Sequence, residues 1–534
     1  MDSNSDIRKR IENIKRQIDL LDRKRETLAD LLKKLEASTA KKETPSSTRK
    51  ELPNIALYLS LFRGRKDLFA RRWENKHGRS GYSPVCSNEW SKGICKKPEV
   101  KCSQCKHRQF IPVTEAMVGR HLKGEITMGV YPLLLDETCN FLAIDFDRKS
   151  WRQDLSALVK VCHRKDVPVA VERSQSGNGA HAWFFFKEPV PAGKARNFGS
   201  ALLTEAMDYS PQMGLDSYDR MFPNQNTMPK GGFGNLIALP LQGRAVKNGN
   251  TVFLDGDLEP YPDQWAYLKT IRRVSMNLIQ NITGKAYQRG RITGIRSSAA
   301  EENEPWKLSL EEPARNDAAI PDLPGMARVV LAGMIYIEKK KLPPAFINRI
   351  IRIAAFQNPE FYRAQAMRLS TWNKPRIISC AVNHQKYIAI PRGCFDQLSE
   401  LFSDAGVEMQ IQDKNHEGKE IGVSFKGTLR EGQRRAMEDL LSNDIGVLSA
   451  STAYGKTVLA ASLIARRKRN TMVLVHRNQL MNQWLEKLRI FLDAGEDSIG
   501  QFGGGRKNRS GIIDVAMLQS LVRKGAVKDI VTEY

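Results

Sequence analysis

The first part of the chain alternates apolar steps of four and three residues. This seam contains one polar position and runs through Ile7, Ile11, Ile14, Ile18, Leu21, Arg25, Leu28, Leu32 and Leu35. An apolar repeat of 3.5 residues flanked by dense charge is typical of a coiled coil. We therefore expect a coiled coil within residues 1–40 that makes the protein a homo-oligomer. The alternative is a single amphipathic helix that packs on the body of the protein.

The pattern after this seam divides the chain into linkers and globular stretches. Residues 41–52 are polar and rich in Ser, Thr and Lys, and residues 291–322 are acidic and interrupted by Pro, so both are predicted linkers. Residues 53–290 alternate short apolar strands with helical stretches, which predicts a domain of helices and strands. Residues 323–425 mix both patterns, and residues 426–534 begin a further α/β unit.

The charge of the chain favours a polyanionic partner. The 84 Lys and Arg residues outnumber the 59 Asp and Glu residues, which gives a formal net charge of +25. Nucleic acid is the first candidate, because basic side chains displace counterions from phosphate backbones, and an acidic membrane surface is the second. We find no apolar run of membrane-spanning length and no signal peptide, so we expect a cytoplasmic protein without a membrane partner.

Four cysteines lie close together within residues 82–110: Cys86, Cys95, Cys102 and Cys105. The last two have the Cys-x2-Cys spacing of a zinc knuckle, in which backbone amides of a tight turn point at the thiolates. Four thiolates make a closed tetrahedral zinc site, so we predict a structural zinc module in this stretch. The alternative is a set of unpaired buried cysteines.

Two aspartates end an apolar strand. In the stretch FLAIDFD, Asp145 and Asp147 are two positions apart, so both side chains leave the same face of the strand. Neighbouring carboxylates repel each other unless divalent cations lie between them, and two such ions can support nucleotidyl transfer. The pair is therefore a candidate site for Mg or Mn ions. The alternative is a solvated strand end.

A loop rich in Gly and Ser lies between the next two predicted strands. In RSQSGNGAHAW the loop contains Ser174, Ser176, Gly177 and Gly179, and His181 begins the following strand. Hydroxyls and exposed backbone amides at close approach are suited to bind a triphosphate, and the His would donate to a phosphate oxygen. The alternative is a hairpin turn with an incidental His.

Together these stretches resemble the archaeo-eukaryotic primase superfamily, the primase-polymerases. The signature of this superfamily is an Asp-x-Asp or Asp-x-Glu strand, then a Ser- and Gly-rich loop that ends in His, and then a third acidic residue after an apolar stretch. Asp145 and Asp147 match the first element, and residues 176–181 match the second.

The third acidic residue of the signature has two candidates. Asp219 precedes the stretch NLIALPLQGR, which is similar to the basic segment of the family, and Asp255 ends the stretch TVFLD. We favour Asp219 and keep Asp255 as the alternative. Asp216 is interpreted as a turn residue.

The sequences of three stretches resemble, more narrowly, the primase domain of TOTE-type conflict systems. These stretches are GVYPLLLDETCNFLAIDFD, SGNGAHAWFFF and NLIALPLQG. TOTE-type systems are bacterial and mobile-element proteins that join a primase-polymerase to a helicase. The resemblance implies an α+β catalytic domain with a zinc-binding module, which synthesises primers or short strands from nucleoside triphosphates on single-stranded or primed DNA, or on RNA. It also suggests association with the nucleoid and a role in defence against mobile DNA.

The resemblance assigns a role to each residue of the predicted site. Asp145, Asp147 and Asp219 would bind two Mg or Mn ions, while Ser176 and His181 would hold the incoming triphosphate.

A second nucleotide motif lies near the end of the chain. The stretch ASTAYGKT has the form A-x-x-x-x-G-K-[ST], in which Lys456 would reach the β and γ phosphates and Thr457 a Mg ion, with Gly455 before them. The upstream stretch GTLREGQRRAMEDLL contains Gln433 and resembles the adenine-reading element of superfamily 2 helicases. The strand-like IGVLSA before the motif and the helix-like TVLAASLIARRK after it are the context that such a loop needs.

Two stretches after this loop, NTMVLVHRNQLMNQWLEKL and IIDVAMLQSL, resemble the next helicase elements, but the sequence then shows no Asp-Glu-x-His/Asp motif and no second RecA-like domain. We therefore expect an incomplete RecA-like α/β domain that binds ATP weakly and does not unwind DNA, with the remaining helicase parts on a separate chain as one possibility. Two rival hypotheses remain for the protein as a whole. The first is a repair polymerase of the same fold that fills gaps or joins ends, and the second is an oligomeric nucleic-acid-binding protein with inactive sites.

Overall fold

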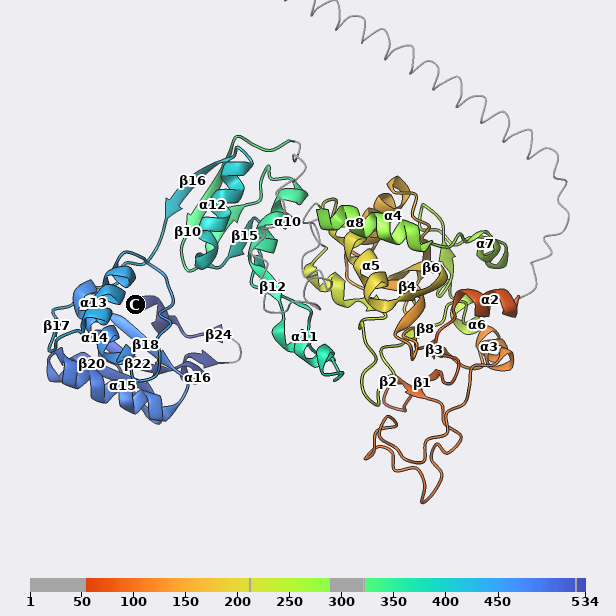
Figure 1. The fold of residues 1–534 in the computed structure, drawn as a ribbon, viewed down its shortest axis with the longest axis horizontal. Coiled ribbons are helices and arrows are strands. Elements are labelled where there is room, and N and C mark those ends of the chain that lie inside the picture. The colour runs from red at the N-terminus through yellow and green to blue at the C-terminus, as the bar shows by residue number, and fades with distance from the viewer. Residues whose placement is uncertain (1–53, 211–212, 289–319, 321, 524–525) are drawn as a thin grey trace, which may run out of the picture.

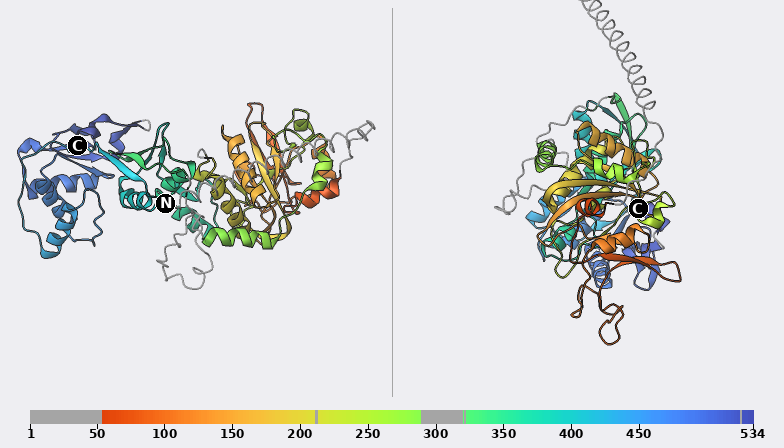
Figure 2. Two further views of the ribbon diagram at one scale, coloured as in Figure 1. Left: turned by 90° about the horizontal axis from the view of Figure 1, so that it is seen from above. Right: turned by 90° about the vertical axis from the view of Figure 1, so that its right-hand side faces the viewer.

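The computed structural model describes residues 54–210, 213–288, 320, 322–523 and 526–534. The predicted coiled coil and first linker lie outside these residues, as does nearly all of the second linker, and so they stay predictions. The described residues form three successive units, which Figure 1 colours from orange to green, green to cyan, and blue. Two further views show the same three units (Figure 2). No helix among the described residues is both long and apolar enough to cross a membrane.

The N-terminal unit is built on a five-stranded antiparallel sheet. Its strand order is β7 (Met221–Phe222), β4 (Thr138–Phe146), β6 (Ala180–Pro191), β5 (Ala170–Arg173) and β9 (Phe253–Leu254). Strands β4 and β6 are rich in aromatic and aliphatic residues that are buried on both faces. Both faces of this sheet must therefore be covered by other elements.

Helices cover one face of the sheet. They are α4 (Trp151–Arg164), α5 (Ala192–Ala206) and α8 (Met276–Gln288). Their apolar side chains pack with Leu142, Ile144 and Phe184 of the central strands in one core cluster. The short 3-10 helix η1 (Leu215–Asp219) leads from this side into edge strand β7.

A second sheet and further helices cover the opposite face. The sheet has the order β2 (Ser80–Pro84), β1 (Ala70–Glu74), β3 (Met128–Val130) and β8 (Ile237–Ala238), and the helices are α2 (Ile55–Leu61), α3 (Glu115–Leu122), α6 (Gly243–Val246) and α7 (Gln264–Thr270). Phe141 and Trp183 pack into this second cluster. The loop of residues 223–236 connects β7, an edge strand of the first sheet, to β8, an edge strand of the second.

The middle unit is a mixed sheet covered by two helices. Its strands, in sheet order, are β14 (Val382–Asn383), β15 (Tyr387–Ile390), β11 (Ile335–Glu338), β10 (Met326–Leu331) and β16 (Glu408–Asp413). Helices α10 (Pro344–Ile353) and α12 (Phe395–Asp404) complete its core through Phe346 and Phe402, whose rings meet edge to face. The short 3-10 helix η2 (Arg392–Cys394) precedes α12.

A segment of the middle unit reaches the N-terminal unit. This docking segment, residues 354–380, contains β12 (Ala355–Gln357), α11 (Pro359–Ala366) and β13 (Ile377–Ser379), and Figure 1 shows α11 beyond the sheet of its own unit. Its backbone and side chains bond the loop of residues 223–236 at several points, including a bond from Gln225 Nε2 to Thr371 Oγ1 of 2.8 Å. Thr371 is buried there.

The C-terminal unit has a sheet in the order β18 (Thr471–Val475), β22 (Ile513–Met517), β20 (Ile499–Gly503) and β21 (Arg506–Asn508). The first three strands are parallel, as expected when helices connect them. The helices are α13 (Glu431–Leu441), α14 (Lys456–Arg467), α15 (Asn478–Phe491) and α16 (Leu518–Leu521), and the remaining short elements are β17 (Ser424–Phe425), β19 (Leu492–Asp493), η3 (Glu496–Ser498), β23 (Val522–Arg523), β24 (Ala526–Val527) and η4 (Asp529–Glu533).

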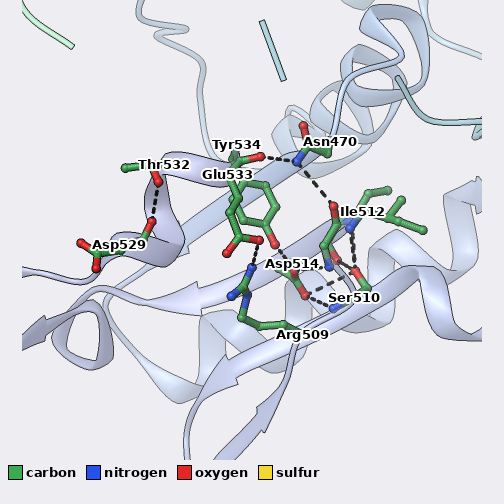
Figure 3. A network of polar contacts seen from close by, with 11 residues as sticks. Asn470, Arg509, Ser510, Ile512, Asp514, Asp529, Thr532, Glu533 and Tyr534 are labelled. Carbon is green, nitrogen blue, oxygen red and sulfur yellow. Dashed lines mark hydrogen bonds and ion pairs between the residues drawn. The ribbon is translucent and has the colours of Figure 1, made fainter. Parts of the chain in front are cut away.

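A polar network holds residues 529–534 against this sheet (Figure 3). The buried carboxylate of Asp514 accepts from the backbone amides of Ser510 and Gly511, both at 2.8 Å, and from the hydroxyl of Tyr534. Burial, together with that bond, raises the pKa of Tyr534 to about 12. Asn470 donates to the carbonyl of Glu533 at 2.7 Å, so side chains from several parts of the unit fix this stretch.

The strand predicted at IGVLSA is not formed. Residues 446–450 have no regular structure, and Ile445 and Val447 are 56% and 94% exposed. A strand needs neighbours for its backbone amides and carbonyls. Within the part of the chain that the structure describes, none of the strands pairs with this stretch, so its apolar pattern alone does not make it a strand.

Candidate active site

The register of three strands in the N-terminal unit brings polar residues into one row. Asp145 of β4 lies opposite His181 of β6, and His181 lies opposite Glu172 of β5. Residues opposite each other in neighbouring strands project from the same face of a sheet. The row therefore joins one of the predicted carboxylates to the predicted phosphate-binding His.

His181 is held by a buried carboxylate that the sequence analysis did not identify. Its Nδ1 lies 2.8 Å from Oε2 of Glu172, which also accepts a 3.0 Å bond from Nε1 of Trp183. Glu172 is only 1% exposed. Because Nδ1 is engaged, the other ring nitrogen, Nε2, points towards the site and lies 3.7 Å from Oδ1 of Asp145.

The surroundings of His181 favour its charged form. Burial by itself would lower the pKa of this His, but the charge and hydrogen bond of Glu172 and the charge of Asp145 outweigh burial and raise its pKa above the ordinary 6.5. The imidazolium is therefore kept as the pH rises above 6.5, and it is lost only when the pH passes the raised value. A cationic donor is suited to bind a phosphate oxygen.

Two glycines let the Ser-rich loop approach the carboxylate strand. A Cβ on Gly179 would lie 2.5 Å from the carbonyl oxygen of Phe146 and 3.2 Å from Cα of Asp147, so only Gly allows this contact. Gly177 has a φ of +76°, and a Cβ there would lie 2.8 Å from Oδ1 of Asn250. The loop therefore lies directly against the end of β4.

The two serines of this loop are also brought to the site. Ser174 Oγ and Ser176 Oγ are 3.2 Å apart, and Ser176 Oγ accepts a bond from the amide of Asn178. Asn250 Nδ2 donates to the carbonyl of Gln175 at 3.2 Å, and Tyr82 Oη of the second sheet donates to Oε1 of the same residue at 3.1 Å. The loop is thus supported by strand β2 of the second sheet and by the connection between α6 and β9.

Asp147 is paired with an arginine that it shares with a second carboxylate. Arg220 contacts Asp147 through Nη1 and lies 3.4 Å from Oδ2 of Asp216 through Nε. Asp216 also pairs with Arg148, the residue after Asp147. Asp216, interpreted from the sequence as a turn residue, therefore lies in the ion-pair network of the predicted pair.

Asp219 is engaged by other residues, although the charge of Asp216 lies near enough to add to the rise of its pKa. Its carboxylate accepts from the backbone amide of Arg376 in the docking segment at 3.0 and 3.2 Å, and it lies near the buried Arg196 of α5. Burial raises the pKa of Asp219 despite these basic neighbours. Asp219 ends the 3-10 helix η1 and Arg220 caps it, so the two neighbouring side chains leave the chain in different directions and Arg220 takes the side of Asp147.

Asp255 also lies apart from the pair. Its Oδ1 accepts from the amides of Asp257 and Glu259 within its own turn. Asp255 follows Leu254 of β9, and Leu254 pairs with Val171 of β5. Because the two strands are antiparallel, the chain after Leu254 runs away from Glu172 and from the site.

The carboxylates suit divalent cations in chemistry but do not form a complete ligand cluster. Asp145 lies near the end of β4 and Asp147 directly after it, and their side chains are 25% and 57% exposed, so both carboxylates are accessible. Among the residues described by the structure, no group of three or more His, Cys, Asp or Glu side chains is arranged to hold a metal ion. A cation at this pair would have to compete with Arg220.

The four predicted zinc ligands line one pocket. Cys86, Cys95, Cys102 and Cys105 all face it, and an isolated bridge between Cys86 and Phe110 closes the base of their loop. Backbone amides of Lys97 and Trp90 bond the sulfur of Cys95 and lower its pKa. The donor set is that of a structural zinc site, although the thiols would have to converge to about 2.3 Å from one ion.

The late phosphate loop contacts the upstream Gln. Gly455, with a φ of +91°, begins α14, and a Cβ on it would lie 2.6 Å from Nε2 of Gln433. Gln433 donates to the carbonyl of Tyr454 at 2.8 Å. Lys456 donates through Nζ to two carbonyls of the loop, both at 2.8 Å, and Thr457 follows it in the first turn of the helix. The structure thus brings all four predicted residues to one loop.

Two families match separate parts of the chain. Residues 53–282 match the family described as "TOTE conflict system, Archaeo-Eukaryotic Primase domain". Residues 426–530 match the family described as "Type III restriction enzyme, res subunit".

Curated relatives match only short parts of the chain. DNA 3'-5' helicase XPB of Kineococcus radiotolerans is 30% identical over 79 residues, which is 15% of this chain and 14% of that protein. Protein 161L of Invertebrate iridescent virus 6 is 35% identical over 83 residues, which is 15% of this chain and 19% of that protein. The chain thus spans less than a fifth of the length of these relatives.

Two solved structures show weak similarity. The UvsW helicase of bacteriophage T4 has a TM-score of 0.26 and 16% identity, and the match covers 36% of this chain and 75% of that one. The archaeo-eukaryotic primase domain of the cyanophage S-2L primase-polymerase has a TM-score of 0.19 and 11% identity, with 36% and 95% covered.

We predict that Glu172→Gln lowers the pKa of His181 in metal-free protein. The amide keeps an acceptor for Nδ1 but removes the negative charge, so burial and the remaining Asp145 set the value. NMR titration of the His ring protons would measure it. Glu188→Gln, an exposed change on β6, is the control and should leave the value unchanged. An unchanged pKa in Glu172→Gln would contradict the role of this carboxylate.

Proposed function

Because the chain joins an archaeo-eukaryotic primase domain of the TOTE conflict-system family to a helicase-related domain, we propose that it is a template-directed primase-polymerase. The observation that carries this proposal is the single site where Asp145, the Ser-rich loop and His181 meet. Its substrates are nucleoside triphosphates and a single-stranded or primed DNA template. The match of residues 53–282 to the archaeo-eukaryotic primase family supports nucleotidyl transfer as the reaction.

In the proposed reaction a hydroxyl oxygen attacks the α-phosphate of the incoming triphosphate. A bond forms between that oxygen and the α-phosphorus, the bond from the α-phosphorus to the oxygen that bridges to the β-phosphate breaks, and pyrophosphate leaves while the hydroxyl proton passes to solvent. His181 donates from Nε2 to a phosphate oxygen, because Glu172 occupies its Nδ1. Ser174 and Ser176 supply hydroxyls beside the same phosphates.

Asp145 and Asp147 would hold divalent cations, which supply charge neutralisation for the attacking and leaving oxygens when bound. For the third carboxylate, the proposal moves from Asp219 to Asp216. Asp216 shares Arg220 with Asp147, whereas Asp219 is engaged by the docking segment. Arg220 would then turn to the triphosphate once cations occupy the carboxylates.

The cysteine loop is proposed to be a structural zinc module. The pocket that its four thiols share and the amide bonds to Cys95 support this assignment. The late phosphate loop is proposed to bind ATP weakly, with Lys456 leaving its loop carbonyls to reach the phosphates.

We predict that the protein extends or initiates strands on single-stranded template with Mg or Mn, measured with labelled dNTPs or NTPs on denaturing gels. Asp145→Asn with Asp147→Asn should abolish synthesis, and His181→Gln should lower kcat/KM by roughly 10²–10³-fold, as for loss of one preorganised donor. Asp255→Asn is the matched control and should remain active.

Comparison of two further variants locates the third carboxylate. Asp216→Asn should lose far more activity than Asp219→Asn if Asp216 is the ligand. Full activity of the Asp145 and Asp147 double variant would refute the assignment of the site. Products formed without any primer separate a primase from a gap-filling polymerase.

For the zinc module, metal analysis of purified full-length protein should give about one zinc per chain. Cys102→Ser should reduce this content, whereas Cys380→Ser, which changes an exposed cysteine outside the loop, should not. A content near zero in the unaltered protein would disprove the module.

For the late loop, a fluorescent ATP analogue should bind the full-length protein, and Lys456→Ala should remove this binding because the phosphates lose their cation. Lys487→Ala, a surface change on α15, should keep it. Equal binding by all three proteins would place the nucleotide elsewhere.

A further inference from the structure

The docking segment is fixed to the N-terminal unit by a set of specific bonds. The amide of Asn226 donates to Oε1 of Gln365 at 3.2 Å, and the amide of Lys230 donates to the carbonyl of Arg368 at 2.7 Å. Arg368 also pairs with Glu137 at 2.6 Å. The segment is therefore held on the loop of residues 223–236 along most of its length.

This well-fixed segment nevertheless exposes large apolar side chains at its tip. Met367 is 62% exposed, Leu369 is 51% exposed and Trp372 is 81% exposed. Single exposed apolar residues are common on surfaces, but three within six positions form a patch that is costly in water and is often a binding surface. We refer to residues 367–374 as the tip.

The backbone beside Trp372 is fixed by its neighbour. Its neighbour Thr371 is buried and accepts the 2.8 Å bond from Gln225. Arg368 and Asn373 both have positive φ values, of 55° and 58°, so the turn around the ring has a conformation that most residues avoid. The backbone that carries the ring is therefore held in place, which reduces the conformational entropy lost when another flat group stacks on the ring.

The tip contacts a loop that begins at the candidate active site. Gln225, which holds Thr371, is five residues from Arg220, a path of at most about 18 Å. The backbone amide of Asp145 donates to the carbonyl oxygen of Arg220 at 2.9 Å. Further along the same loop, Gly231 lies beside the carbonyl of Ser103 in the cysteine loop.

The charges around the tip favour an anionic partner. Four basic residues belong to the tip or lie next to it in the docking segment and the loop: Lys230, Arg363, Arg368 and Lys374. Two carboxylates oppose them, since Glu137 pairs with Arg368 and Glu360 pairs with Lys374. Lys230 is exposed. An exposed aromatic ring beside basic residues is suited to a single-stranded nucleic acid, whose bases stack on the ring while its phosphates meet the cations.

We propose that residues 367–374 form a stacking platform for the single-stranded DNA template, with Trp372 contacting a base and Lys230 a backbone phosphate. The inference rests on the proposed function, because that function supplies the template. It adds a template contact contributed by the middle unit to a site that lies in the N-terminal unit. The +25 net charge of the chain favours this partner over an apolar protein surface.

Binding of a fluorescently labelled oligo-thymidine strand to full-length protein, followed by anisotropy without nucleotide or added Mg, tests the platform. Trp372→Ala should weaken binding by roughly ten-fold or more, as for loss of one base–aromatic stack, and Trp372→Phe should retain most of the affinity. Lys230→Ala should lower the slope of log affinity against log salt by about one. Tyr209→Ala, which removes another exposed aromatic ring, is the control and should bind normally.

The outcomes separate the platform from the catalytic proposal. Equal binding by Trp372→Ala and wild type, an equal loss in Tyr209→Ala, or no binding of single strands by wild type would overturn the platform. The Asp145→Asn, Asp147→Asn double variant should bind the strand normally while synthesising nothing. A wild-type protein that shows the Trp372 effect on binding but makes no product would support the platform and refute the polymerase.

Discussion

The register between β4 and β6 is the constraint on which the candidate active site depends. It places Asp145 opposite His181, and a slip of β6 by one residue would turn His181 to the other face of the sheet, away from Asp145. Apolar packing fixes this register, because Trp183 belongs to the core on one face of the sheet and Phe184 to the core on the other. A slip would exchange these two large rings between cores shaped for different neighbours. Residues that touch no substrate therefore determine where the reactive groups lie.

Electrostatics then ties two members of the site to each other. A carboxylate as buried as Glu172 is costly unless it is paired, and His181 and Trp183 both bond it. In return its charge keeps the buried imidazole protonated. Neither charge is favourable in this position without the other, so the pair acts as one unit that presents a single N–H to the site. The phosphate-binding group is therefore preorganised before any triphosphate arrives.

The sequence predicted the local features of this site and missed those that depend on distant contacts. Alternation along one strand was enough to place Asp145 and Asp147 on one face, and the glycines marked the close approach of the loop. Glu172 could have been found, since a carboxylate inside an apolar strand needs a partner. Asp219 and Arg220 differ by only one position, and which of them faces the site depends on pairing of β7 with β4, strands far apart in the sequence. The two-residue strands β7, β8 and β9 are too short to leave a periodic pattern, so these edge strands of the two sheets could not be foreseen.

The adjacent residues Asp219 and Arg220 link the middle unit to the candidate site. Asp219 is held from one side by the backbone of Arg376, and Arg220 contacts Asp147 on the other side. One peptide unit separates the two contacts, and a peptide unit is planar and stiff. A displacement of the docking segment that shifts this peptide unit shifts the backbone of both residues, and with it the position of Arg220 relative to Asp147. Because Arg220 competes with any cation for this carboxylate, the position of the middle unit bears directly on whether the carboxylate pair is open to a ligand.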